Sequence, residues 1–438
     1  MKVKSLGKVF AALAFSLTLA LPVCAAPSSL GVTVAVQDGY SCDYGVDIPF
    51  TRSARTQDYT FALYAGSTAA GTPTVKAEVT ITPTAQVNVH LPLRHDAAAP
   101  STWTLRVTAH VAPGREAFDR EASIDKTFTT PPSCGCAAGT AGAYYVGTGT
   151  AASPFRVATP AQLAHVNNHL AASFIQTQDI RLSGNWTPLG GGSYNKFTGA
   201  YDGKGYVVHD LQINCRLPCG LFGSIYGATV QNLGLESSKT IQGIYTGSDN
   251  LVAVGALVGS ADRSTIRYCY VNAKVTGPPG YTGSTSGTIS TAGMMVGNAE
   301  NGTLVSNCYA YGQLTNSNWH GGGLVGRSNT GMTIENCYAV TGVPNGHPQG
   351  TGGLLGYSAV PGSTPIRCSY WLNGQALAAG NNSASLTSVS RLTAGSQLAS
   401  QGTFSGWDFS NVWTIGSVRD INYTGSTYTA PVLRVFNH

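Results

Sequence analysis

Hydrophobic positions recur in four copies of one short pattern between residues 256 and 370. Each copy has an apolar piece close to Gly-Leu-Val-Gly, followed by a second piece close to Ile-x-Asn-Cys-Tyr. A fainter copy precedes them, and the five closing glycines are Gly223, Gly259, Gly297, Gly326 and Gly356, which gives a period of 29 to 38 residues. A period in this range with a constant internal offset is typical of stacked structural repeats.

The two pieces of each repeat are too short to be stable strands alone, so each must pair with its counterpart one repeat later. We therefore predict a parallel β-helix in which each coil adds about 4.8 Å. Corresponding side chains then stack, with a bend at Asn307 and Asn336. The predicted inward ladders consist of Ile266, Val305, Ile334 and Ile366, and of Cys269, Cys308, Cys337 and Cys368.

The repeat resembles the GLUG motif (Gly-Leu-any-Gly) of bacterial secreted and surface proteins. The similarity is closest at residues 321–340, and it extends to the lead-in at 146–223 and to the tail at 406–415. The resemblance implies a right-handed β-helix and an exported, often adhesin-like protein. It implies no reaction.

The first part of the chain has a different pattern, in which apolar and polar residues mostly alternate along short segments between residues 28 and 133. Turn residues separate these segments at the spacing of a β-sandwich, so we predict an all-β, immunoglobulin-like fold there. The expected organisation is a signal peptide at 1–25, the sandwich at 28–133, a linker at 134–145, the GLUG-repeat β-helix at 146–378 and a capping region at 379–438.

Both ends of the predicted β-helix need covers. At its start, Thr159, Pro160 and Gln162 have the spacing of a helix N-terminus with a capping box, which predicts a helix to about Leu170 that closes the first coil. At its end, Trp407, Phe409 and Trp413 are expected to plug the last coil, with a carbohydrate platform as the alternative role.

Composition and charge support an exported all-β protein. Glycine is abundant, with 54 of 438 residues, and only 10% of residues are charged. Residues 1–25 have a basic start, an apolar stretch and a small-residue cleavage site, as secretion signals do. The three lysines of this predicted signal account for much of the formal charge of +5. The remaining charge of about +2 excludes a basic nucleic-acid patch. We predict a secreted or cell-surface monomer without a transmembrane segment.

Nine cysteines follow the predicted signal, and an oxidising destination permits disulfides. Cys42 is expected to pair with Cys134 or Cys136, and Cys215 with Cys219. The four ladder cysteines are expected to be buried thiols, because side chains stacked in parallel have poor disulfide geometry.

Sequence motifs for catalysis or metal binding are weak. His165 and His169 lie one helical turn apart, but two imidazoles without a third ligand do not define a zinc site. Some immunoglobulin A peptidases with GLUG repeats are zinc enzymes with a His-Glu motif, whereas Val166 follows His165 here. We therefore expect no metal, cofactor or enzymatic activity. Asp262 and Glu300 share one position in successive repeats. In the alternative that the chain is an enzyme, they are the candidates for a glycosidase-like pair of catalytic carboxylates.

The prediction for function is binding through loops on a rigid scaffold. The loops at 277–293 and 342–352 vary in length, and Tyr281, Trp319 and His347 are the expected ligand contacts. The expected ligand is a glycan or a host or matrix surface. The alternatives are a polysaccharide-degrading lyase or hydrolase and a spacer that displays the N-terminal sandwich.

Overall fold

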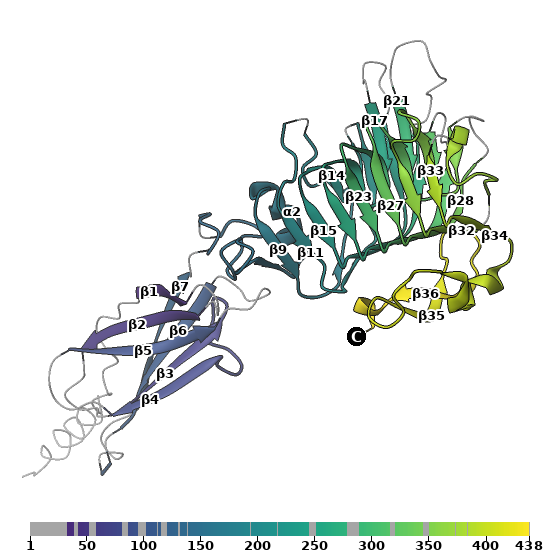
Figure 1. Ribbon diagram of the computed structural model, residues 1–438. Coiled ribbons are helices and arrows are strands. Elements are labelled where there is room, and N and C mark those ends of the chain that lie inside the picture. The colour runs from purple at the N-terminus through teal and green to yellow at the C-terminus, as the bar shows by residue number, and fades with distance from the viewer. Residues whose placement is uncertain are drawn as a thin grey trace, which may run out of the picture. The chain divides into compact units, whose positions relative to one another are not determined.

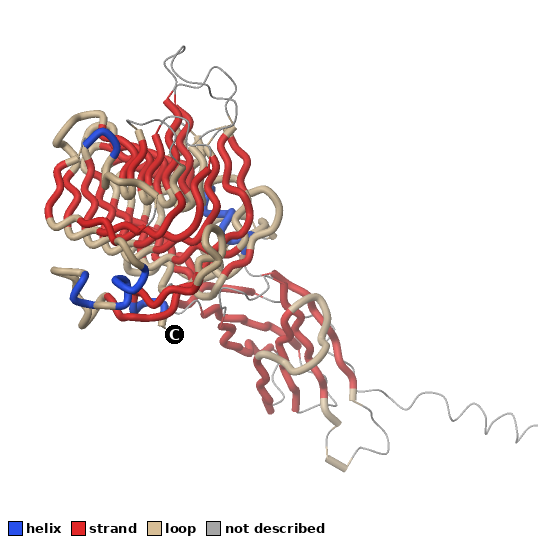
Figure 2. The backbone as a smooth tube through the Cα atoms, turned by 90° about the vertical axis from the view of Figure 1, so that its right-hand side faces the viewer, coloured by secondary structure: helices blue, strands red, loops and turns tan. Residues whose placement is uncertain are grey.

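We analysed a computed structural model of the chain. It describes residues 33–38, 43–51, 58–80, 86–94, 102–111, 113–114, 121–129, 132–137, 139–192, 194–216, 218–244, 251–277, 289–315, 320–344, 350–372, 374–382 and 384–437. The chain divides into two compact units, residues 1–148 and 149–438, and strands are the main regular secondary structure of both (Figure 2).

The first unit contains two antiparallel sheets. One has the order β1-β2-β5 and the other has the order β4-β3-β6-β7. In the second sheet, Tyr59, Phe61, Leu105 and Val107 are buried, as expected for strands with one apolar face. The strands are β1 (Thr33–Asp38), β2 (Asp43–Thr51), β3 (Asp58–Ala65), β4 (Val75–Thr80), β5 (Gln86–Arg94), β6 (Thr102–Ala109) and β7 (Ala122–Thr129).

The second unit is a stack of parallel strands (Figure 1). The chain passes through the same sheets once per repeat, and we call each passage a rung. One sheet contains β8 (Phe155–Val157), β9 (Ser173–Gln176), β11 (Ala200–Asp202), β15 (Thr229–Gln231), β19 (Thr265–Arg267), β23 (Thr303–Ser306), β27 (Met332–Glu335), β31 (Pro365–Arg367) and β33 (Ser385–Thr387). The next contains β10 (Ile180–Arg181), β12 (Val207–His209), β13 (Ile213–Cys215), β16 (Gly234–Gly243), β20 (Tyr270–Thr276), β24 (Tyr309–Thr315), β28 (Tyr338–Gly342), β32 (Tyr370–Leu372) and β34 (Ser390–Leu392).

Two further parallel sheets complete the rungs. One consists of β14 (Phe222–Tyr226), β18 (Val258–Asp262), β22 (Val296–Glu300), β26 (Val325–Ser328) and β30 (Leu355–Ser358). The other consists of β17 (Leu251–Gly255), β21 (Ile289–Gly293), β25 (His320–Gly322) and β29 (Thr351–Gly352). The short 3-10 helices of the later part are η2 (Gly380–Asn382), η3 (Gly395–Ala399), η4 (Gln401–Thr403) and η5 (Arg434–Phe436).

The register of the stack follows the repeat. Ile266 pairs with Val305, Val305 with Ile334, and Ile334 with Ile366. All four side chains are buried, so the apolar positions of successive repeats lie above one another. The chain is an all-β protein with parallel sheets built from its repeats.

The bend before the cysteine position requires a left-handed backbone. Asn307 and Asn336 have φ of +51°, and Asn tolerates this conformation better than most residues. The next residue of each of three rungs is a cysteine, and all three are fully buried: Cys269, Cys308 and Cys337. Their sulfurs lie within 3.8 Å of carbonyl oxygens of the preceding rung.

The prediction for Cys368 is wrong. Cys368 takes the bend itself, with φ of +45°, and its side chain is only partly buried. The fully buried Ser369 occupies the cysteine position and accepts a hydrogen bond from the Cys337 backbone N–H. The physical reason is the pairing of Ile366 and Tyr370 with the preceding rung, which fixes where the three residues between them lie.

The helix near the start of the second unit is shorter than predicted. The capping box of Thr159 and Gln162 is formed, and α2 (Pro160–His165) is followed by a 3-10 turn, η1 (Val166–Asn168). Regular helix therefore ends before Leu170, because His169 leaves the helical conformation with φ of −139° and ψ of 47°. Across the described residues, no helix has the length and apolar character needed to cross a membrane.

The predicted aromatic plug at the end of the stack is also wrong. Strands β35 (Trp413–Arg419) and β36 (Thr427–Leu433) form an antiparallel hairpin that lies along the side of the stack (Figure 1). It packs on a stripe of tyrosines, one from each of four successive rungs: Tyr270, Tyr309, Tyr338 and Tyr370. These tyrosines point away from the interior, so an apolar side face, and not the last rung, is what the C-terminal aromatic residues cover.

Candidate binding cavity and metal-ligand cluster

The residues predicted to contact a ligand, Tyr281, Trp319 and His347, lie outside the described residues, as does Cys42.

The two acids at equivalent repeat positions are neighbours. Asp262 at the end of β18 pairs in register with Glu300 at the end of β22. An Asp262 carboxylate oxygen accepts a hydrogen bond from the Asn301 amide at 2.9 Å, and a Glu300 oxygen accepts one from the Asn329 amide, also at 2.9 Å. Each carboxylate thus has a neutral amide as hydrogen-bond partner, and the Arg263 Nε lies 3.8 Å from an Asp262 oxygen, as in a turn that is stabilised by its own side chains.

A cavity of about 840 Å³ lies on the first rungs of the second unit. Trp186 and Pro188 line it, and its polar lining residues include Asn185, Asn195 and Arg216. The remaining lining residues are Asn167, Leu170, Thr187, Gly191, Gly192 and Cys215. The prediction from sequence missed this cavity, because its residues come from three separate segments without a shared motif.

Hydrogen bonds hold the walls of this cavity in place. The Asn167 side chain accepts from the Gly190 backbone N–H at 2.9 Å, which ties the loop after Pro188 to η1. The Asn185 side chain accepts from the Asn214 backbone N–H at 2.8 Å, and the buried Trp186 indole donates to the Leu221 carbonyl at 3.2 Å. A cavity with fixed walls binds its ligand at a lower cost in conformational entropy.

A disulfide lies beside the cavity. Cys215 and Cys219 are joined, with Cα atoms 6.1 Å apart, in the pairing that the sequence suggested. The bond closes the short loop that carries Arg216, and it thereby limits where this guanidinium can go.

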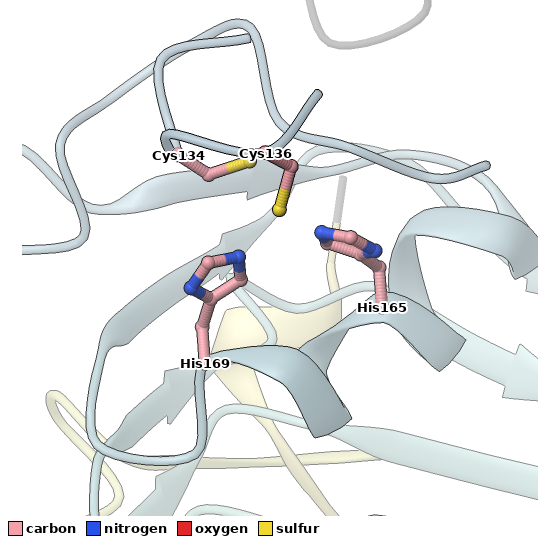
Figure 3. A group of neighbouring side chains, drawn as sticks. All are labelled: Cys134, Cys136, His165 and His169. Carbon is pink, nitrogen blue, oxygen red and sulfur yellow. The ribbon is translucent and has the colours of Figure 1, made fainter. Parts of the chain in front are cut away.

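The described residues contain one group of four side chains with metal-binding atoms close together. Cys134, Cys136, His165 and His169 each offer a sulfur or nitrogen, and these atoms all lie within 4.8 Å of one another. Figure 3 shows the two imidazoles and the Cys136 sulfur facing a common space. The spacing of the two histidines in the sequence indicated only half of this group. The Cys-Gly-Cys pair was the signal for the other half, and we assigned it only to disulfides.

Each pair of this group has its own local support. Gly135, with φ of +78°, makes the tight turn between the two cysteines, and the Cys134 N–H donates to the Tyr144 carbonyl. His165 ends α2 and His169 follows η1, so their rings lie 5.2 Å apart between centroids.

Burial shifts the pKa values of two members of this group. It lowers the pKa of His169, which favours the neutral imidazole. It also raises the pKa of the Cys136 thiol, and the neighbouring Cys134 raises it further.

Comparison with known proteins supports the repeat assignment. Residues 250–276 match the family model of the GLUG motif, which confirms that the chain carries this repeat. No curated protein matches the chain. The chain is similar to the crystal structure of a Bacteroides ovatus protein described as a candidate immunoglobulin A1 protease, with 18% identity, coverage of 66% of this chain and 94% of that one, and a TM-score of 0.41. A similarity of this size supports no inference about fold or activity.

Proposed function

We propose that the chain is an exported, adhesin-like binding protein whose second unit presents a glycan-binding site. In this proposal the rungs form a right-handed parallel β-helix, and residues 28–133 form an immunoglobulin-like sandwich. The parallel register of the rungs, the two antiparallel sheets of the first unit and the signal-like residues 1–25 support these assignments.

The observation that carries the binding proposal is the cavity at Trp186. Sugars combine hydroxyl groups with apolar C–H faces, and amide side chains both donate and accept hydrogen bonds. Asn185 and Asn195 supply amides, Arg216 adds a cation, and Trp186 with Pro188 supplies apolar surface. No carboxylate is among the described lining residues, so Arg216 favours a glycan that carries acidic groups.

Glycan-array binding followed by titration of the purified chain tests this proposal. We expect saturable binding to acidic glycans without product release, and Arg216→Ala or Asn195→Ala should weaken binding at least tenfold. His209→Gln, a change of a polar side chain outside the cavity, serves as the matched control and should bind as the unaltered chain does. Equal affinity in all four proteins would show that binding, if present, occurs elsewhere.

A polysaccharide-degrading activity is the second candidate, because Asp262 and Glu300 pair in register on adjacent strands. Such an enzyme would release reducing or unsaturated sugar ends. It would lose this activity in both Asp262→Asn and Glu300→Gln, whereas a binding protein would keep its affinity in both variants. Assays of both kinds on the same glycan separate the two functions.

A further inference from the structure

We propose that Cys134, Cys136, His165 and His169 bind one zinc ion. The proposal concerns structure and not turnover, and it is independent of glycan binding. It rests on four ligand side chains of two types, thiol and imidazole, on their proximity and on the local elements that hold each pair.

The four ligand atoms need to move only a short distance to form a zinc site. Zinc–sulfur bonds of about 2.3 Å and zinc–nitrogen bonds of about 2.0 Å in a tetrahedron place the ligand atoms about 3.3–3.8 Å apart. The four atoms already lie within 4.8 Å of one another. Side-chain rotations that move each atom by less than about 1 Å would therefore complete the tetrahedron.

The surroundings keep the imidazoles in place. The Asn168 amide nitrogen is 3.1 Å from the His165 Nδ1, and turning this amide over would place its oxygen there. The Phe155 ring lies 5.4 Å from the His169 ring between centroids. An Asn amide can present either its oxygen or its nitrogen. With the oxygen toward Nδ1–H, the Nε2 lone pair of His165 is directed to the metal, as in the outer coordination shell of many zinc sites.

The ligand set selects the metal. Two thiolates and two imidazoles suit zinc, whereas calcium and magnesium bind through oxygen. On binding, each thiol forms its bond to zinc as a thiolate and releases its proton to solvent, while each imidazole binds as the neutral ring. Because protein groups supply all four positions, the site has no open position for a substrate, and its role is structural.

The rival use of these cysteines is oxidation, since the chain is expected in an oxidising compartment. A disulfide formed by Cys134 or Cys136, with each other or with Cys42, would remove the thiolates. Zinc and a disulfide are therefore mutually exclusive at this cluster, and one experiment separates them.

The test uses the full exported chain, purified without reductant, in zinc analysis by mass spectrometry and in non-reducing peptide mapping. We expect one zinc per chain and no disulfide at Cys134 or Cys136. Replacement of zinc by cobalt should give the visible bands of a tetrahedral site and the near-ultraviolet band of thiolate ligands. Chelator competition should show at least about tenfold weaker binding in Cys136→Ser and in His169→Gln.

Cys368→Ser and His209→Gln are matched controls, because each removes the same side-chain type outside the cluster. Both should retain one zinc with unchanged affinity, and circular dichroism of all variants checks that they fold. A disulfide at Cys134 or Cys136 in the purified chain, or zinc binding that neither Cys136→Ser nor His169→Gln weakens, would overturn the proposal.

Discussion

At the scale of single residues, the closing glycine of a rung cannot be replaced by a larger residue without a clash, because the backbone of the preceding rung lies too close. A Cβ atom on Gly326 would lie 2.6 Å from the Gly297 carbonyl oxygen and 2.8 Å from the Ala292 backbone nitrogen. A Cβ atom on Gly297 would in turn lie 2.5 Å from the Val254 nitrogen. The closing glycine of the motif is therefore required by close backbone approach, and not by a positive φ.

Gly326→Ala tests this account. We expect the substitution to lower the free energy of unfolding by about 1–3 kcal/mol, because the obstructing atoms are backbone and cannot rotate away. Gly402→Ala is the control, since a Cβ there meets only the Ser400 hydroxyl, at 3.6 Å. Urea unfolding measures both changes, and an equal, small effect at the two positions would contradict the role given to Gly326.

Asp202 makes the stability of the stack depend on pH. Burial by itself would raise the pKa of Asp202, but hydrogen bonds from Asn232, Lys204 and Gln231 outweigh it and lower the pKa below the usual 3.8. A carboxyl whose pKa is lower in the folded state stabilises the fold above its unfolded pKa, and this contribution is lost as pH falls through the folded value.

We therefore expect Asp202→Asn to be less stable than the unaltered chain at pH 7. The difference should shrink as the pH falls from about 4 toward 2, because the unaltered carboxyl becomes neutral as well. Thermal unfolding of both proteins across this range provides the measurement. A difference that stays constant with pH would show that the Asp202 charge makes no contribution.

At the scale of elements, the tyrosine stripe explains why the C-terminal hairpin lies where it does. The rings of Tyr270 and Tyr309 stack at 5.0 Å, and those of Tyr309 and Tyr338 at 5.2 Å. Trp413 packs beside this stripe, and the Tyr338 hydroxyl donates to the Pro431 carbonyl at 2.7 Å. The hairpin thereby removes from water an aromatic surface that each added repeat makes longer.

Trp413→Ala should detach this hairpin before the rungs unfold. Trp413 is fully buried, and removal of such a side chain costs about 3–5 kcal/mol. Trypsin should then cleave after Arg419 much faster than in the unaltered chain. Ile421→Ala, in the same hairpin but with an exposed side chain, should leave the cleavage rate nearly unchanged. Cleavage at one rate in both variants would rule out this anchoring role.

The sequence predicted the rungs well, because their register depends on residues that recur at nearly constant spacing, such as Val305 and Ile334. The prediction misplaced Cys368, because it aligned this residue with the other cysteines by residue type and not by its spacing to Tyr370. The course of the C-terminal hairpin depends on contacts between Trp413 and residues about a hundred positions earlier, and no local pattern encodes such a pairing. The metal-ligand cluster was missed for the same reason, since Cys136 and His169 meet only in the folded chain.

At the scale of the whole molecule, each of the two units contains buried hydrophobic residues of its own. Trp103, Tyr59 and Phe61 are buried in the first unit, and the repeat ladders with Trp413 are buried in the second. Single domains usually unfold in one cooperative step, so we expect each unit of the full chain, once a chelator has removed any zinc, to unfold in a step of its own.

Calorimetry of the full chain should therefore show two transitions. Trp103→Ala should lower the temperature of one transition and Trp413→Ala that of the other, because each substitution leaves a cavity in one core only. The transition sensitive to Trp413→Ala should have the larger enthalpy, since enthalpy rises with the number of residues that unfold and the second unit is the longer one. If either substitution shifted both transitions equally, the two units would instead form one cooperative body, and the rigid stack would extend its stability to the N-terminal sheets.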